Sequence, residues 1–163
     1  RWFYRRIIGE LIMVRILVDG DACPVKEQIA QLQQHYAFDW WIFLDVSHVL
    51  DMDHAHIVYC DKGKDSADLV LLREAKKGDL VITSDIGLAG LALSKKCDVL
   101  DFNGRIISEE AIEAMLLERS IYQKMRRQGK YGPRQKARSQ KTNQQFYEAC
   151  QKYLEEVYER EGN

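Results

Sequence analysis

The sequence predicts one α/β domain with three layers, in which a mainly parallel sheet lies between two layers of helices. Short apolar segments with the length of buried strands alternate with segments of helical periodicity, the pattern of right-handed βαβ units. Candidate acidic ligands come shortly after two of the apolar segments, where the carboxyl edge of a parallel sheet binds ligands. A length of 163 residues fits one domain with an ordinary core.

Five segments rich in apolar, β-branched or aromatic residues are predicted as buried strands. They lie at residues 16–18, 40–44, 57–60, 80–83 and 99–102. Between the second and third of them, residues 46–56 mix His and Asp with few apolar residues, and we predict a loop or a short helix there.

Helices are predicted in most of the intervening segments from their apolar spacing. Three of them cover residues 24–35, 67–77 and 86–96, and the second is expected to end at Gly78. Ser108 is a good cap for a fourth helix that reaches residue 127. A terminal amphipathic helix is marked by its apolar residues Phe146, Ala149, Tyr153 and Val157.

The chain divides into three stretches. Residues 1–12 are treated as an N-terminal extension, because Met13 directly precedes the first strand; residues 13–127 form the α/β domain, and residues 128–163 a basic segment and a helix that packs on it. No cleavage site follows the extension, and no stretch reaches the roughly 20 apolar residues of a membrane span. Four widely spaced cysteines without a C-x-x-C pair favour a reduced, cytoplasmic protein.

Five aspartates are candidate metal ligands at the carboxyl edge of the sheet. Asp19 and Asp21 follow the first strand, Asp85 follows the fourth, and Asp65 and Asp68 lie one turn apart at a helix start. Clustered carboxylates repel one another unless a cation or protons neutralise them, and oxygen ligands suit Mg²⁺ or Mn²⁺. Such an ion would activate water and clamp the phosphate oxygens of a phosphodiester, with Asp19 and Asp85 as catalytic residues.

A structural role is the alternative, because Asp is also common in turns and caps. Capping and ligation compete for Asp65 in particular. Asp21 is either a second ligand or an acid at the entry of the first helix.

A basic segment follows the fourth helix. Residues 124–141 hold eight Lys or Arg and no Asp or Glu, and Tyr131 offers an aromatic surface among these cations. Such a combination stacks bases and neutralises phosphates, although the segment could equally be a solvated tail. The candidate nucleic-acid-binding residues are Lys130, Tyr131, Arg134, Lys136 and Arg138.

Three strings of the sequence, at residues 16–25, 62–68 and 78–89, resemble the YaiI/YqxD family of uncharacterised bacterial proteins. The match also includes Gly132 and Pro133. Because this family is usually grouped with PIN-like nuclease folds, the resemblance implies such a fold. It places Asp19, Asp65 or Asp68, and Asp85 at acidic positions that hold divalent metal. The family usually has Ala where this chain has Gly20, a change expected to affect only the flexibility of the turn.

Three functions compete. The first is a metal-dependent nuclease acting on RNA, and the second is a nucleic-acid-binding module that keeps the fold without hydrolysing anything. The third, less favoured, is a phosphatase of the haloacid dehalogenase type, which also places Asp-x-Asp after its first strand. In that class a Gly-Asp motif follows a strand, whereas Gly78-Asp79 precedes one here, and the sequence has no matching Lys and Thr pair. Enzymatic activity and oligomeric state stay open.

Overall fold

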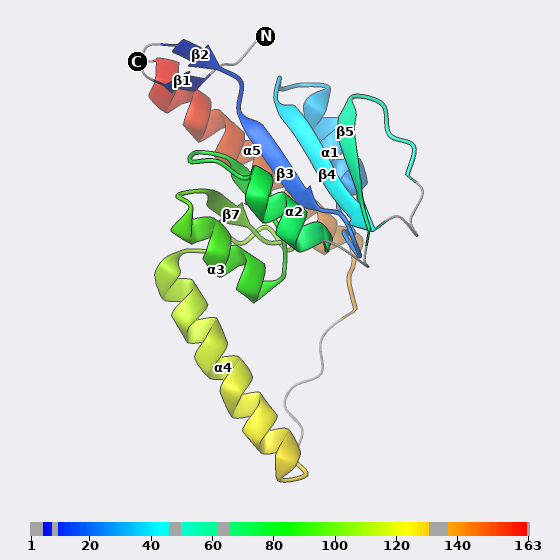
Figure 1. Cartoon of the computed structure of the whole chain (residues 1–163), viewed down its shortest axis with the longest axis vertical. Helices are drawn as coiled ribbons and strands as arrows, with labels where there is room; N and C mark the ends of the chain where they lie inside the picture. The colour runs from blue at the N-terminus through cyan, green and yellow to red at the C-terminus, as the bar shows by residue number, and fades with distance from the viewer. Residues whose placement is uncertain (1–4, 8–9, 46–49, 62–65, 131–136, 163) are drawn as a thin grey trace.

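Five parallel strands form the central sheet of the protein (Figure 1). The structure is a computed structural model that describes residues 5–7, 10–45, 50–61, 66–130 and 137–162. Every pairing within this sheet is parallel, and the strand order is β5-β4-β3-β6-β7. The strands are β3 (Arg15–Asp19), β4 (Asp39–Asp45), β5 (Ala55–Cys60), β6 (Leu80–Ile82) and β7 (Asp98–Leu100). The predicted α/β class is therefore confirmed.

Helices cover both faces of this sheet. One layer contains α1 (Lys26–Gln33) and α5 (Gln140–Gly162), and the other contains α2 (Ala67–Glu74) and α3 (Ile86–Ser94). Successive residues of β3 point to opposite layers: Ile16 and Val18 are buried with α1 and α5, whereas Leu17 is buried with α2 and α3. This burial on both faces explains why the inner strands β3, β4 and β6 are almost purely apolar between their ends.

Helix α4 (Glu109–Arg127) begins beside α3 and then projects away from the sheet (Figure 1). Its N-cap is Ser108, whose hydroxyl accepts a hydrogen bond from the Ala111 N–H at 3.1 Å, so the predicted cap is confirmed. The predicted end at residue 127 is confirmed as well.

Several predicted element boundaries differ from the structure, among them the end of α2 and the start of β5. Helix α2 ends at Glu74 instead of residue 77, because Ala75 is extended and the Lys76 N–H donates to the Asp79 carboxylate at 2.8 Å. Gly78 does have a positive φ of 89°, but it lies in the turn before β6. Strand β5 begins at Ala55, within the segment predicted as a loop or short helix.

The N-terminal residues contain two strands that the sequence did not predict. Strands β1 (Arg5–Ile7) and β2 (Glu10–Ile12) pair antiparallel, and β1 lies against α5 (Figure 1). All four cysteines are buried, and each carries a thiol. None of the described helices is sufficiently long and apolar to cross a membrane.

Candidate functional site

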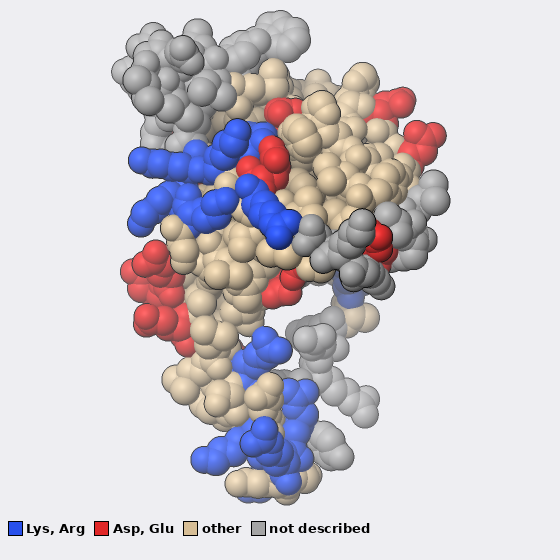
Figure 2. Space-filling view, viewed as in Figure 1, with Lys and Arg blue, Asp and Glu red and all other residues tan. Residues whose placement is uncertain are grey.

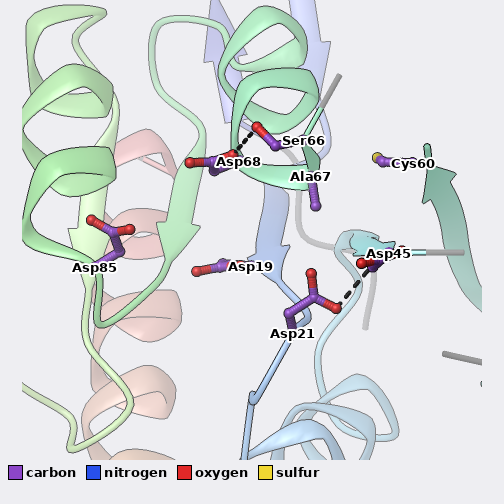
Figure 3. Close-up of a pocket in the computed structure, with 8 residues that line it drawn as sticks. All are labelled: Asp19, Asp21, Asp45, Cys60, Ser66, Ala67, Asp68 and Asp85. Carbon is purple, nitrogen blue, oxygen red and sulfur yellow. Dashed lines mark hydrogen bonds between the residues drawn. The ribbon is translucent and has the colours of Figure 1, made fainter. Parts of the chain in front are cut away.

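An acidic pocket of about 160 Å³ lies at the carboxyl edge of the sheet (Figure 3). It is placed at the topological switch point between β3 and β6, since the chain leaves β3 through α1 in one helix layer and enters β6 from α2 in the other. Open α/β sheets bind ligands at such a point. The residues that line the pocket are Asp19, Asp21, Asp45, Cys60, Ser66, Ala67, Asp68 and Asp85.

Asp19 ends β3 and lies at the centre of the pocket (Figure 3). Its Oδ2 accepts a hydrogen bond of 2.9 Å from the hydroxyl of Thr83, a buried residue that directly follows β6. Burial raises the pKa of Asp19 to about 6, and the carboxylates of Asp85, Asp21 and Asp68 act in the same direction against the Thr83 hydrogen bond. The pocket therefore concentrates negative charge around a carboxyl group that is poorly solvated.

Asp21 is placed by a tight turn after β3. The Cys23 N–H donates to the Gly20 carbonyl at 3.3 Å, and Ala22 in this turn has a left-handed φ of 59°. The turn directs Asp21 toward β4, where its Oδ1 accepts a hydrogen bond of 3.2 Å from the Asp45 N–H. Asp21 lines the pocket, and the N-cap of α1 is Val25, which has no side-chain cap.

Gly20 has a packing role that the sequence did not predict. A Cβ atom at this position would lie 2.6 Å from Ile42 Cγ2, 2.7 Å from Leu44 Cδ2 and 2.8 Å from the Phe43 carbonyl oxygen. The expectation that Gly20 affects only the flexibility of the turn is therefore wrong. The absence of a side chain lets β3 and its acidic turn approach β4 closely.

Asp85 is both a helix cap and a pocket residue. Its Oδ1 accepts a hydrogen bond from the Leu88 N–H at 3.2 Å, as the N-cap of α3. Its own N–H donates at 3.0 Å to Thr83 Oγ1, the same hydroxyl that donates to Asp19. One threonine hydroxyl thus connects the two aspartates on either side of the switch point.

Asp68 lies in the first turn of α2, on the opposite side of the pocket opening from Asp21 (Figure 3). Its Oδ1 accepts hydrogen bonds from the Ser66 hydroxyl and, at 3.0 Å, from the Leu69 N–H. The structural and functional interpretations of the aspartates are therefore compatible, because local hydrogen bonds hold Asp68 and Asp85 where they line the pocket. Asp65 falls outside the described residues.

Several pocket residues were not among the predicted ones. Asp45 ends β4 and is buried, and it directly follows the predicted strand 40–44 as Asp19 follows 16–18. The criterion that identified Asp19, an acidic residue directly after a predicted strand, applies to Asp45 as well. Cys60, at the end of β5, and Ser66 carried no such signal in the sequence.

The donor set of the pocket suits a hard cation. Four aspartates surround Asp19, and carboxylate oxygens are the ligands that Mg²⁺ and Mn²⁺ prefer. Among the residues that the structure describes, no three His, Cys, Asp or Glu side chains are arranged as a preformed metal site. The predicted metal ligands therefore share one pocket, and their binding of a cation stays a prediction.

Two of the predicted nucleic-acid-binding residues are described. Lys130 is exposed just after α4. The Arg138 guanidinium instead donates to the Phe102 carbonyl at 2.5 Å and to the side-chain oxygens of Asn103 at 3.0 Å and Asn143 at 2.6 Å. Arg138 thus fastens the start of α5 to the loop after β7. Tyr131, Arg134 and Lys136 lie outside the described residues.

The fold and the pocket define a class: a parallel three-layer α/β protein with an acidic pocket at the carboxyl edge of its sheet. The family model described as "Uncharacterized BCR, YaiI/YqxD family" matches residues 17–156. The chain belongs to this family.

Curated bacterial relatives support this assignment. A UPF0178 protein of Natranaerobius thermophilus is 41% identical over 80% of this chain and 89% of the relative. UPF0178 proteins of Listeria monocytogenes serotype 4b are 37% identical over 88% of this chain and 99% of the relative. One from Bacillus cytotoxicus is 35% identical over 86% of this chain and 92% of the relative. No solved structure matches the chain.

Proposed function

We propose that the acidic pocket binds Mg²⁺ or Mn²⁺ and that the protein is a metal-dependent nuclease acting on RNA phosphodiesters. The observation that carries this proposal is the convergence of Asp19, Asp68 and Asp85 from three separate segments onto the switch point of the sheet. A carboxyl group whose pKa is raised by burial and by like charges is stabilised in its ionised form when a cation binds beside it.

Asp19 and Asp85 would be the principal ligands, with Asp21 and Asp68 as further oxygen donors. A bound divalent ion supplies activation of water and neutralisation of charge on the phosphodiester. Thr83 keeps the Asp19 carboxylate in one orientation through its 2.9 Å hydrogen bond. Helices α2 and α3 both begin at the pocket, so their N-terminal partial charges favour the approach of a phosphate group.

The pH dependence of metal binding follows from this arrangement. Asp19 must lose its proton to bind a cation, and its pKa is about 6. Affinity for Mn²⁺ should therefore rise as the pH increases through about 6 and level off above it.

The test combines isothermal titration with Mn²⁺ and cleavage of single-stranded RNA. Asp19→Asn keeps the size of the side chain and its ability to accept from Thr83, but removes the charge. The matched control is Asp53→Asn, because Asp53 is exposed and does not line the pocket. We expect the first variant to lose Mn²⁺ binding and cleavage and the second to retain both. Cleavage that survives Asp19→Asn would overturn the assignment of the site.

A non-catalytic nucleic-acid-binding module is the second candidate. The observation that favours it is that Asp68 and Asp85 each use one oxygen for local backbone hydrogen bonds, which leaves fewer donors for a cation. In that case RNA binds to the wild-type protein without being cleaved in Mg²⁺ or Mn²⁺, and Asp19→Asn leaves the affinity for RNA unchanged.

A further inference from the structure

Helix α4 carries an exposed apolar stripe, formed by Ala114, Leu117 and Ile121. Their spacing of three and four residues places them on one face of the helix. The exposed fractions of Leu117 and Ile121 are 64% and 50%. Exposed large apolar residues this close together on one face are typical of an interaction surface.

The α4 stripe faces away from the body of the protein. The structure describes all of α4, and the only buried residue in it is Ile112. Leu117 and Ile121 follow Ile112 by five and nine positions, which at 100° per residue puts them on the opposite side of the helix. Helical segments shorter than about 12–15 residues are marginally stable in water without tertiary packing. The projecting half of the 19-residue helix α4 is such a segment, so it would be stabilised by a partner.

The charges of α4 indicate what this partner is. All acidic residues of the helix precede all basic ones, and Figure 2 shows acidic side chains at its start and basic side chains at its far end. Favourable interaction with the helix dipole explains only the charges in the first and last turns. The acidic residues are Glu109, Glu110, Glu113 and Glu118, and the basic residues are Arg119, Lys124, Arg126 and Arg127.

We propose that the α4 stripe is the contact surface of a homodimer, in which two copies of α4 pack antiparallel. In this orientation the acidic half of each helix faces the basic half of the other, whereas a parallel orientation would bring like charges together. Leu117 of each copy packs beside Ile121 of the other, and the same spacing brings Glu113 opposite Arg127 of the second copy. The contact is isologous and closes after two copies.

Analytical ultracentrifugation of the full chain, without metal or nucleic acid, tests this contact independently of the acidic pocket. We expect the wild type to form dimers and Leu117→Glu to raise the dissociation constant about a hundredfold. The matched control is Leu116→Glu, because Leu116 is 49% exposed on the same helix but lies outside the α4 stripe. A monomeric wild type at about 100 μM, or equal effects of the two substitutions, would overturn the proposal.

A charge exchange tests the orientation of the helices. Glu113→Lys alone and Arg127→Glu alone each place like charges opposite one another twice in the dimer, so each should raise the dissociation constant about tenfold. The double variant restores opposite charges at both places and should return to within about threefold of the wild type. If the double variant is as weak as the sum of the single variants, the antiparallel register is wrong.

Discussion

Replacement of Asp19 by Asn should stabilise the folded protein at about pH 8. Asp19 has a pKa of about 6 in the folded protein, compared with 3.8 for an unperturbed Asp, because the group is buried and three carboxylates lie near it. The folded protein therefore binds this proton more tightly than the unfolded chain does. The contribution of Asp19 to the free energy of unfolding should fall as the pH rises from about 4 to about 6, and stay lowered above that range.

The size of the effect follows from the two pKa values. At 1.36 kcal/mol per pKa unit, their difference corresponds to about 3 kcal/mol at neutral pH and above. Asn is uncharged at every pH and can still accept the hydrogen bond from Thr83. Asp19→Asn should therefore be up to about 3 kcal/mol more stable than the wild type at about pH 8, and less than about 1 kcal/mol more stable near pH 4.

Urea denaturation of both proteins at several pH values, with a chelator present, measures this difference. Asp53→Asn, an exposed substitution outside the pocket, serves as the control and should change stability little at any pH. If Asp19→Asn is no more stable than the wild type at about pH 8, the carboxylates do not crowd Asp19 and the electrostatic reasoning fails. When Mn²⁺ replaces the chelator, the wild type should gain stability and the variant should not.

Three further substitutions test the packing around the pocket and the opposite edge of the sheet by urea denaturation. Gly20→Ala should destabilise the protein by about 1–3 kcal/mol, because the Cβ atom of the alanine would lie 2.6–2.8 Å from atoms of β4. An unchanged midpoint of urea denaturation would mean that β4 moves aside without cost. Ala22→Gly should stabilise it by about 1 kcal/mol, since glycine adopts a φ of 59° without the strain that alanine has there. A loss of stability would contradict this. Arg15→Met should cost about 3 kcal/mol, because the Arg15 guanidinium donates to Asp79 at 2.7 Å and to Glu74 at 2.8 Å, and without it the buried Asp79 would lose the cation that pairs with its charge. A change below about 1 kcal/mol would show that the pair is not needed.

The inner strands of the central sheet could be predicted from sequence because they are buried on both faces. The run from Ile16 to Val18 has no polar residue, and each of its side chains enters one of the two cores. The N-terminal hairpin was not predictable in the same way. Strands β1 and β2 have three residues each, include Arg5, Arg6 and Glu10, and owe their pairing to each other and to the neighbouring α5.

The acidic pocket could be predicted in part. Asp19, Asp21, Asp68 and Asp85 were all found from their positions at strand ends and helix starts, and the structure places them in one pocket. What the sequence does not contain is the relative position of the segments. The register that brings Asp45 to Asp21, and Thr83 to Asp19, depends on the order β4-β3-β6, which no local pattern specifies.

Asp19 is the pocket residue that distinguishes a functional role of the pocket from a purely structural one. Asp68 and Asp85 accept backbone hydrogen bonds at helix starts, and a structural role alone can account for their presence. Asp19 does not stabilise a helix start in this way. The folded protein raises the pKa of Asp19 to about 6, so its ionised form lowers the stability of the fold at neutral pH. An uncharged residue would satisfy Thr83 equally well. A destabilising carboxylate at the switch point of the sheet is therefore best explained by a ligand that requires its charge. A cation is such a ligand, because it would offset the repulsion between Asp19 and the neighbouring carboxylates.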